Sequence, residues 1–178
     1  MADTLATIRT RRSVRKFKPD MIPADVLDQV LEAGTWAPTG MGRQSPVILC
    51  VTDKAVRDEL ARMNREIMIE TGMGVKRGMD PFYGAPVVCA VLADAQAPTG
   101  RDDGNLVIEN MMLAATDLGL GSCYIYRAKE EFERPEGKEI LKKAGIEGDY
   151  VGVGHVILGY ADMSPKAAPR KEGYIYKI

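Results

Sequence analysis

The chain has 178 residues, of which 46% are hydrophobic and 28% are charged, and its 24 basic residues stand against 25 acidic ones. These values are ordinary for a globular protein, and the length fits one domain over residues 1–178. A net charge of −1 argues against a general nucleic-acid binder, which would carry a broad basic excess. The longest apolar runs have only the length of a strand, which argues against a membrane span.

Positive charge is nevertheless concentrated near the N-terminus, where the segment 9–18 holds six Lys or Arg residues in ten positions. A nucleic-acid arm, a targeting peptide and a site for one compact anion would each account for it. The residues before it include Asp3 and lack an apolar run of seven or more, which excludes a secretory signal. Because the cluster runs directly into sequence that looks folded, we expect it to belong to the mature domain rather than to a mitochondrial presequence.

The first part of the chain predicts three helices and one strand. A short helix is expected over 4–10, and a second helix lies between Pro23, in its first turn, and Gly34, past its end. The apolar run over 47–51 predicts a buried strand. Asp53 then caps a third helix, in which apolar residues repeat at intervals of four, three and four.

The later part of the chain also alternates between helices and strands. The segment 71–86, with four glycines and two prolines, predicts a long loop of the kind that is usually functional or disordered. The other expected elements are strands over 87–93, 122–126 and 150–160, a buried helix over 102–118, one or two short helices over 130–144, and a possible strand over 174–178.

The cysteines and the single histidine give no sign of a metal site. Cys50, Cys89 and Cys123 lie far apart in the sequence, and each falls in an apolar run, so we expect buried free thiols. An odd number of cysteines without metal-ligand spacing suits a reducing cytosol, which predicts a cytoplasmic location. His155 is the only histidine, which rules out a metal site built from several histidines.

Two basic pairs could hold one anion. Arg11 and Arg15 lie four residues apart with Ser13 between them, and two guanidinium groups with a hydroxyl match the oxygens of a phosphate. Arg170 and Lys171 form a second pair near the C-terminus. A solvated surface charge is the simpler explanation for any one of these residues, but the two pairs together favour a phosphate site.

Two glycine-containing loops favour a ligand surface. In the loop 36–46, WAPTGMGRQSP, glycine would permit close approach of the main chain to a flat ring, whose edge the free amides could bind. A plain connecting loop is the alternative, but GLGS over 119–122 offers a second surface of this kind. Neither GLGS nor GVGH over 152–155 has the complete spacing of a dinucleotide-binding loop, so a Rossmann fold is not indicated.

The chain resembles the FMN-dependent nitroreductases from Arg11 to Lys171. The segments that carry the resemblance occur in the family's order: RRSVRKF, LEAGTWAPTGMGRQSP, DPFYGAP, NMMLAATDLGLGSCYI, and GHVILGY followed by PRK. The resemblance implies an α+β, nitroreductase-like fold with a central mixed β-sheet flanked by helices. It also implies a homodimer with FMN bound at the interface, so that each site takes residues from both subunits.

The resemblance assigns roles to individual residues. Those that match the motifs for the phosphate and the flavin edge are Arg11, Arg12, Ser13, Arg15, Arg170 and Lys171. Those that match the loop reaching the flavin of the other subunit are Pro38, Thr39 and Gly40. Those that match the segment beside the flavin ring are Leu120, Gly121 and Ser122, and Asn64 is a weaker match to a contact with its pyrimidine edge. In the long loop, the expected substrate contacts are Phe82 and Tyr83.

Three positions depart from the family pattern. Many relatives carry Asn where this chain has Gly42, and Pro-Trp where it has Ser45 and Pro46. The missing Asn side chain removes one possible hydrogen bond to the flavin and would widen the pocket. The insertion that often shapes substrate access is also short, so the resemblance defines the substrate range least well.

Three hypotheses follow from the sequence. The first is an oxidoreductase that uses NADH or NADPH and bound FMN to reduce nitroaromatics, quinones or similar electron-poor rings by a ping-pong mechanism, with the flavin rather than a side chain carrying the chemistry. The second is a flavin-dependent dehydrogenase or dehalogenase of one specific metabolite. The third is a non-enzymatic FMN-binding protein. None of them involves nucleic acid or a membrane.

Overall fold

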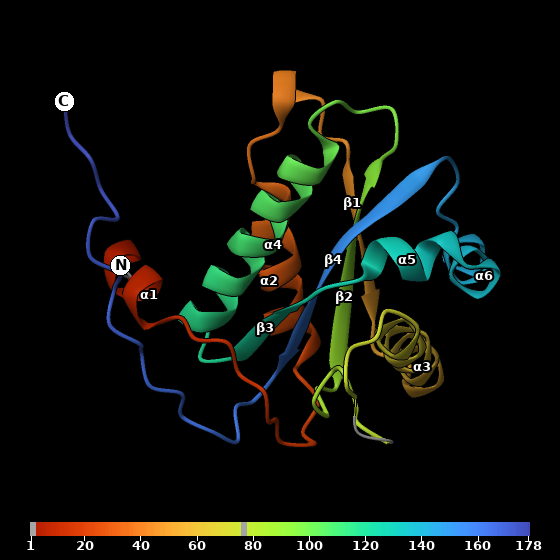
Figure 1. Cartoon of the computed structure of the whole chain (residues 1–178), viewed down its shortest axis with the longest axis horizontal. Coiled ribbons are helices and arrows are strands. Elements are labelled where there is room, and N and C mark those ends of the chain that lie inside the picture. The colour runs from red at the N-terminus through yellow and green to blue at the C-terminus, as the bar shows by residue number, and fades with distance from the viewer. Residues whose placement is uncertain (1–2, 76–77) are drawn as a thin grey trace.

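The centre of the molecule is a four-stranded β-sheet with helices on both faces (Figure 1). The computed structural model describes residues 3–75 and 78–178. The strands lie in the order β1-β2-β4-β3, and their bounds are Pro46–Val51 for β1, Val87–Asp94 for β2, Gly121–Ile125 for β3 and Tyr150–Gly159 for β4. The α+β fold expected from the sequence is thereby confirmed.

The helices form two layers, with α2 and α4 on one face of the sheet and α3, α5 and α6 on the other. Their bounds are Thr4–Thr10 for α1, Ala24–Thr35 for α2, Lys54–Glu70 for α3, Gly100–Asp117 for α4, Ala128–Glu133 for α5 and Pro135–Lys143 for α6, with a short 3-10 helix η1 at Gly40–Gly42. Each layer has its own buried apolar cluster, so the central strand β2 is buried on both faces and its sequence is continuously apolar. None of the described helices is long and apolar enough to cross a membrane.

The central sheet is antiparallel, and the prediction of a mixed sheet was wrong. All three pairings between the named strands are antiparallel. The one parallel pairing found among the described residues is an isolated bridge between Ser13 and Ser122, which adds the N-terminal segment to β3. At the opposite edge β1 has no strand beside it other than β2, within residues 3–75 and 78–178.

Local signals determine most of the element boundaries. α1 has the predicted bounds, and the predicted cap of α3 is confirmed, because the Asp53 carboxylate accepts a hydrogen bond from Val56 N at 2.9 Å. The prediction for Gly34 was wrong, since this residue lies inside the last turn of α2 rather than past its end. A Cβ here would lie 2.8 Å from Met111 Cγ, so the close packing of α2 on α4 requires the glycine.

The C-terminal segment 174–178 forms no strand within this chain and is strongly exposed. Figure 1 shows the tail, in blue, running along the same side of the molecule as α1 and then away from it. The strand expected there therefore has no partner within the chain.

The three cysteines are free thiols. Cys89 and Cys123 are buried as predicted, but Cys50 is partly exposed because its strand, β1, lies at the edge of the sheet. The register of β1 and β2 places Cys50 directly opposite Cys89, although the two are far apart in the sequence.

Candidate flavin site

The basic N-terminal segment lies against the end of the sheet. Val14 N donates a hydrogen bond to the carbonyl oxygen of Ser122 at 2.9 Å, and Lys18 N donates to that of Tyr160 at the same distance. Val14 and Phe17 are buried, which anchors the segment to the core and leaves basic side chains between them, such as Arg15, at the surface. The alternation of apolar and basic residues therefore holds the positive charges in place.

The segment brings Arg11, Ser13 and Arg15 together beside β3. Burial raises the pKa of the Cys123 thiol, and the positive charges of Arg15 and Arg11 with a hydrogen bond from Ser13 act in the opposite direction. The charges of Arg15 and Arg11 and the Ser13 side chain are therefore close enough to Cys123, the residue next to Ser122, to affect its thiol. The Ser122 hydroxyl is itself buried and has no hydrogen-bond partner among the described residues.

The neighbouring glycine explains how the segment can approach so closely. A Cβ on Gly121 would lie 3.0 Å from Val14 Cγ2, so the absence of a side chain lets Val14 pack on β3. Leu120 is buried in the core between α4 and the sheet, which leaves its main chain rather than its side chain for a ligand. The main chain of Leu120, Gly121 and Ser122 therefore forms a surface beside the side chains of Arg11, Ser13 and Arg15.

Arg12 is engaged differently. Its guanidinium donates to the carbonyl oxygens of Arg9, at 2.7 Å, and Arg11, at 2.6 Å, where α1 ends. A positive charge at the C-terminal end of a helix is favourable, so this arrangement stabilises α1. A contact between Arg12 and a flavin stays a prediction, for which the Nε and Nη2 groups that make neither of these bonds would serve.

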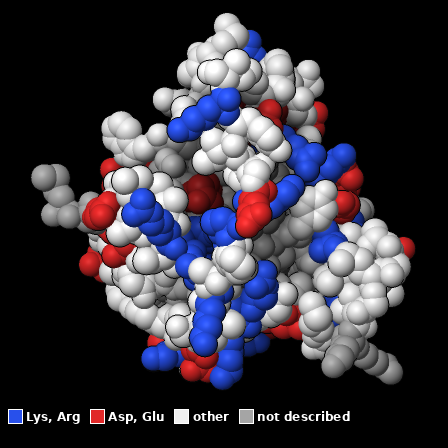
Figure 2. Space-filling model, turned by 60° about the vertical axis from the view of Figure 1, so that its left-hand side comes forward, with Lys and Arg blue, Asp and Glu red and all other residues white. Residues whose placement is uncertain are grey.

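The second basic pair lies in the exposed C-terminal tail. Arg170 donates a hydrogen bond to the carbonyl oxygen of Ala168 at 2.8 Å, and Lys171 is exposed next to it. Figure 2 shows basic side chains gathered on the face that carries α1 and the tail. The hydrogen bond that Arg170 makes is thus local to the tail, and a contact of this pair with the same anion as Arg11 and Arg15 stays a prediction.

The loop that follows α2 forms a second, separate part of the site. Thr39 Oγ1 accepts a hydrogen bond from Gln44 N at 2.9 Å, which closes the loop around η1. Met41 has a backbone φ of 57° and Gln44 a φ of 50°, and residues other than glycine rarely adopt such positive values. Met41 is also 89% exposed. A strained loop with an exposed apolar tip is typical of a functional contact.

A buried carboxylate, which sequence reasoning missed, holds this loop in place. Asp103 is only 4% exposed, and its oxygens accept from Gly40 N at 3.0 Å and from Thr99 Oγ1 at 2.9 Å. A Cβ on Gly40 would lie 2.2 Å from Thr99 Oγ1, so glycine here permits the close packing of the loop on Thr99, and its approach to a flat ring stays a prediction. The sequence offered one signal for this contact: Thr99, with a hydroxyl, and Asp103, with a carboxylate, lie four positions apart at the start of an apolar helix.

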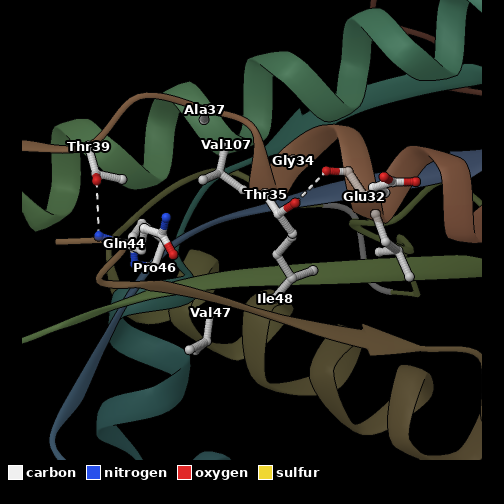
Figure 3. A pocket seen from close by; sticks show the side chains of 11 residues that line it. Glu32, Gly34, Thr35, Ala37, Thr39, Gln44, Pro46, Val47, Ile48 and Val107 are labelled. Atoms are coloured by element: carbon white, nitrogen blue, oxygen red, sulfur yellow. Dashed lines mark hydrogen bonds between the residues drawn. The ribbon is translucent and has the colours of Figure 1, made fainter. Parts of the chain in front are cut away.

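A cavity of about 480 Å³ opens beside the same loop (Figure 3). Thr39 and Gln44 close one end, and Glu32 of α2 lies at the other. The walls between them come from α2, β1 and α4 and are mostly aliphatic, including Ile48 and Val107. Because none of the described residues that line it is basic, this cavity suits an apolar segment or ring rather than a phosphate.

The two parts of the predicted site lie at opposite ends of α4. The loop of Gly40 is bound to Asp103 in its first turn, whereas Ser122 and the basic segment follow its last turn. A helix of 18 residues is about 27 Å long at about 1.5 Å per residue. One chain therefore does not bring the predicted residues into a single site, as Figure 1 also shows.

Asn64 was assigned wrongly. It is fully buried, and its amide donates to the carbonyl oxygen of Tyr126 at 2.9 Å and to the Glu131 carboxylate. Glu131 in turn lies 3.0 Å from Nε2 of His155, which is also fully buried. Asn64 thus completes an internal polar cluster and has no surface to offer a flavin.

The prediction that Phe82 contacts the substrate was also wrong. Its ring is fully buried and packs edge-on against the ring of His155, with the centroids 5.3 Å apart. The Asp80 carboxylate accepts from Phe82 N at 2.9 Å and from Gly84 N at 2.8 Å, which folds this end of the long loop into a turn. Tyr83 is partly exposed and remains a predicted contact; residues 76–77 of the loop lie outside the described residues.

Comparison with known proteins gives a consistent result. The sequence model of the Nitroreductase family matches residues 8–160. A crystal structure of a nitroreductase with bound FMN from Bacteroides fragilis is similar over 100% of both chains, with a TM-score of 0.90 and 31% identity. An NADPH-flavin oxidoreductase of Vibrio harveyi is 27% identical over 98% of this chain and 72% of its own. An iodotyrosine deiodinase of Thermotoga neapolitana is 25% identical over 92% of this chain and 91% of its own.

Proposed function

The chain belongs to the nitroreductase family, and from this premise we propose that it is an FMN-dependent oxidoreductase that uses NAD(P)H and acts as a homodimer. The observation that carries the proposal is the bridge between Ser13 and Ser122. It brings the segment suited to a phosphate against the segment suited to a flavin ring. The similarity to an FMN-bound nitroreductase over the whole chain supports the same choice of cofactor.

The residues at this bridge fit FMN chemically. The guanidinium groups of Arg11 and Arg15 and the Ser13 hydroxyl would hold the phosphate. The buried Ser122 hydroxyl, which has no partner in the part of the chain that the structure describes, would bond a polar edge of the ring. When bound, FMN supplies the ring that accepts a hydride from NAD(P)H and passes it to the acceptor. The side chains bind and orient it, and positive charge close to it favours an anionic reduced ring.

A second copy of the chain would complete the site. The loop of Gly40 cannot reach the basic segment of its own chain, because α4 separates them. Apolar side chains are exposed at both ends of α4, with Met41, next to Gly40, near its start and Leu5 and Ile8, on α1, near its end. Burying such side chains is the main driving force for subunit association.

The C-terminal tail supplies a way to hold two copies together. Residues 174–178 alternate between apolar and other side chains, stand clear of their own chain and have no strand partner. β1 offers an unpaired edge and an aliphatic cavity next to it. The tail of one subunit would add a strand to the Pro46–Ile48 part of β1 of the other, where the cavity lies, and place apolar side chains there.

A flavin-dependent dehalogenase is the second candidate. The similarity to an iodotyrosine deiodinase over most of both chains favours it over other reactions of the same fold. A non-enzymatic role is disfavoured, because the relatives are named as oxidoreductases. Nitroaromatics and quinones, rather than halogenated aromatics, remain the first choice of acceptor because an FMN-bound nitroreductase is similar to this chain over its whole length, with a TM-score of 0.90.

The absorption spectrum of the purified protein tests the proposal. We expect a flavin spectrum as isolated or after incubation with FMN, and bleaching when NADH or NADPH is added without oxygen. A nitroaromatic, a quinone and a halogenated tyrosine would then be compared by the rate at which each restores the colour. A protein that stays colourless with excess FMN would contradict the flavoprotein assignment.

A further inference from the structure

The strands β1 and β2 bring together two cysteines that the proposed reaction does not use. Cys50 and Cys89 are direct partners in this antiparallel pair. Residues opposite each other in such a pair have Cα atoms about 4.5 or 5.5 Å apart, depending on the hydrogen-bonding pattern. Disulfides require about 4.4–6.8 Å, so either spacing permits a bond without a change of register.

The two thiols share a face of the sheet but differ in exposure. Both belong to the apolar cluster beneath α2 and α4, where Cys89 is fully buried and Cys50 lies partly exposed at the edge. Hydrogen bonding with Cys89 lowers the pKa of the Cys50 thiol, against the opposing effects of burial and of the Asp28 charge. The same hydrogen bond, together with burial, raises the pKa of Cys89 well above its usual value.

This asymmetry gives the two residues different chemical roles. The thiolate is the form of cysteine that reacts with oxidants, and it forms where the pKa is lowered and the sulfur can be reached. Cys50, which is partly exposed, is the more accessible of the two, whereas Cys89 is fully buried and lies directly opposite it in the strand pair.

We propose that Cys50 and Cys89 form a peroxide-sensitive pair that closes reversibly into a cross-strand disulfide. The Cys50 thiolate attacks the terminal oxygen of a hydroperoxide, and the O–O bond breaks. The hydroxyl group passes to the sulfur, which is thereby oxidised to a sulfenic acid. The remaining oxygen of the peroxide takes up one proton and leaves as an alcohol or, from hydrogen peroxide, as water. The sulfur of Cys89 then displaces the hydroxyl group, and its own proton leaves with that group as water. An external dithiol would return both residues to thiols by exchange.

The disulfide would link the edge strand of the sheet covalently to its central strand. It would close a loop from residue 50 to residue 89, which contains α3 and the segment 71–86. It would also tie β1, which continues directly from the strained loop of Gly40, to the central strand β2. Closing a loop of this length is expected to raise the midpoint of thermal unfolding by about 5–15 °C.

Peptide mapping tests the proposal on the flavin-loaded protein. Reduced protein would be exposed to hydrogen peroxide, its remaining thiols alkylated, and the protein digested without reductant for mass spectrometry. We expect a crosslinked peptide pair that contains Cys50 and Cys89, lost again after treatment with dithiothreitol. Cys123, buried on β3, is the matched control and should remain alkylatable only after unfolding.

Two variants make the result decisive. Cys89→Val keeps an apolar side chain in the core and should leave a sulfenic acid on Cys50 that dimedone traps. Cys50→Ser, at the partly exposed position, should abolish both the crosslink and the rise in the unfolding midpoint. The proposal is overturned if Cys50 stays fully alkylatable after peroxide, if it proceeds to sulfinic acid in the wild type without a crosslink, or if the crosslink involves Cys123.

Discussion

Arg15 is the exposed side chain on which the proposed phosphate site depends most directly. Arg15→Ala should weaken FMN binding about ten- to a hundredfold, since one charge-assisted hydrogen bond contributes about 1.5–3 kcal/mol. Titration of the apoprotein with FMN, followed by fluorescence, measures the change. Lys18→Ala is the matched control because Lys18 belongs to the same segment but its charge acts on Asp162. Equal losses in both variants would show that only general positive charge matters.

Asp103 should matter for both the stability of the fold and the shape of the loop. Asp103→Ala leaves the amide of Gly40 and the hydroxyl of Thr99 without their acceptor, and should lower the free energy of unfolding by about 1–3 kcal/mol. Urea denaturation measures this change. Asp102→Ala, an exposed carboxylate in the same helical turn, is the control and should have little effect. A variant at Asp103 as stable as the control would show that the loop is held by other contacts.

Individual site residues were predictable only where their role follows from the local sequence. The alternation around Val14 and Phe17 explains why the neighbouring basic residues are displayed. Asn64 and Phe82 were misassigned because their burial depends on α5 and β4, which are distant in the sequence. Asp103 was missed for the same reason, since its partner Gly40 lies 63 residues away.

Helices and strands were predicted well where local signals decide them, as at the Asp53 cap and along the apolar run of β2. The direction of strand pairing was not predictable, because the connections allow parallel and antiparallel arrangements alike. Gly34 shows the limit of a local signal: a glycine near a helix end usually marks that end, but here it serves the contact between α2 and α4.

The loop between α3 and β2 should influence the choice of acceptor more than the binding of FMN. Its last part is fixed by Asp80 and the buried Phe82, whereas Gly72–Val75 make no comparable contact with the sheet. Removing Gly72–Val75 should therefore change the relative kcat/KM for a nitroaromatic and a quinone, while FMN affinity stays within about twofold. A parallel loss of FMN affinity would place this segment in the cofactor site instead.

The whole molecule leaves little room for two separate substrate sites beside one flavin. Reacting atoms in hydride transfer must lie about 3–3.5 Å apart, so NAD(P)H and the acceptor cannot both stack on the same face of the ring. We expect them to bind in turn, which gives parallel lines in double-reciprocal plots of initial rate. Converging lines would indicate a ternary complex and contradict alternation at one site.

The tail should control assembly. A chain that ends after Gly173 loses the strand that would add to β1 of the second copy, so its dimer should dissociate at a higher protein concentration. Sedimentation over a range of concentrations measures the shift. Because the truncation leaves the described elements untouched, far-ultraviolet circular dichroism should be unchanged. An unchanged dissociation constant would show that the exposed apolar side chains suffice.

The central claim is that the flavin site exists only between two copies of the chain. Light scattering coupled to size exclusion, with flavin absorbance recorded across the same peak, tests it most directly. We predict a mass of twice the 19.5 kDa chain with one FMN per chain. A single 19.5 kDa chain that carries FMN and oxidises NAD(P)H would contradict the claim.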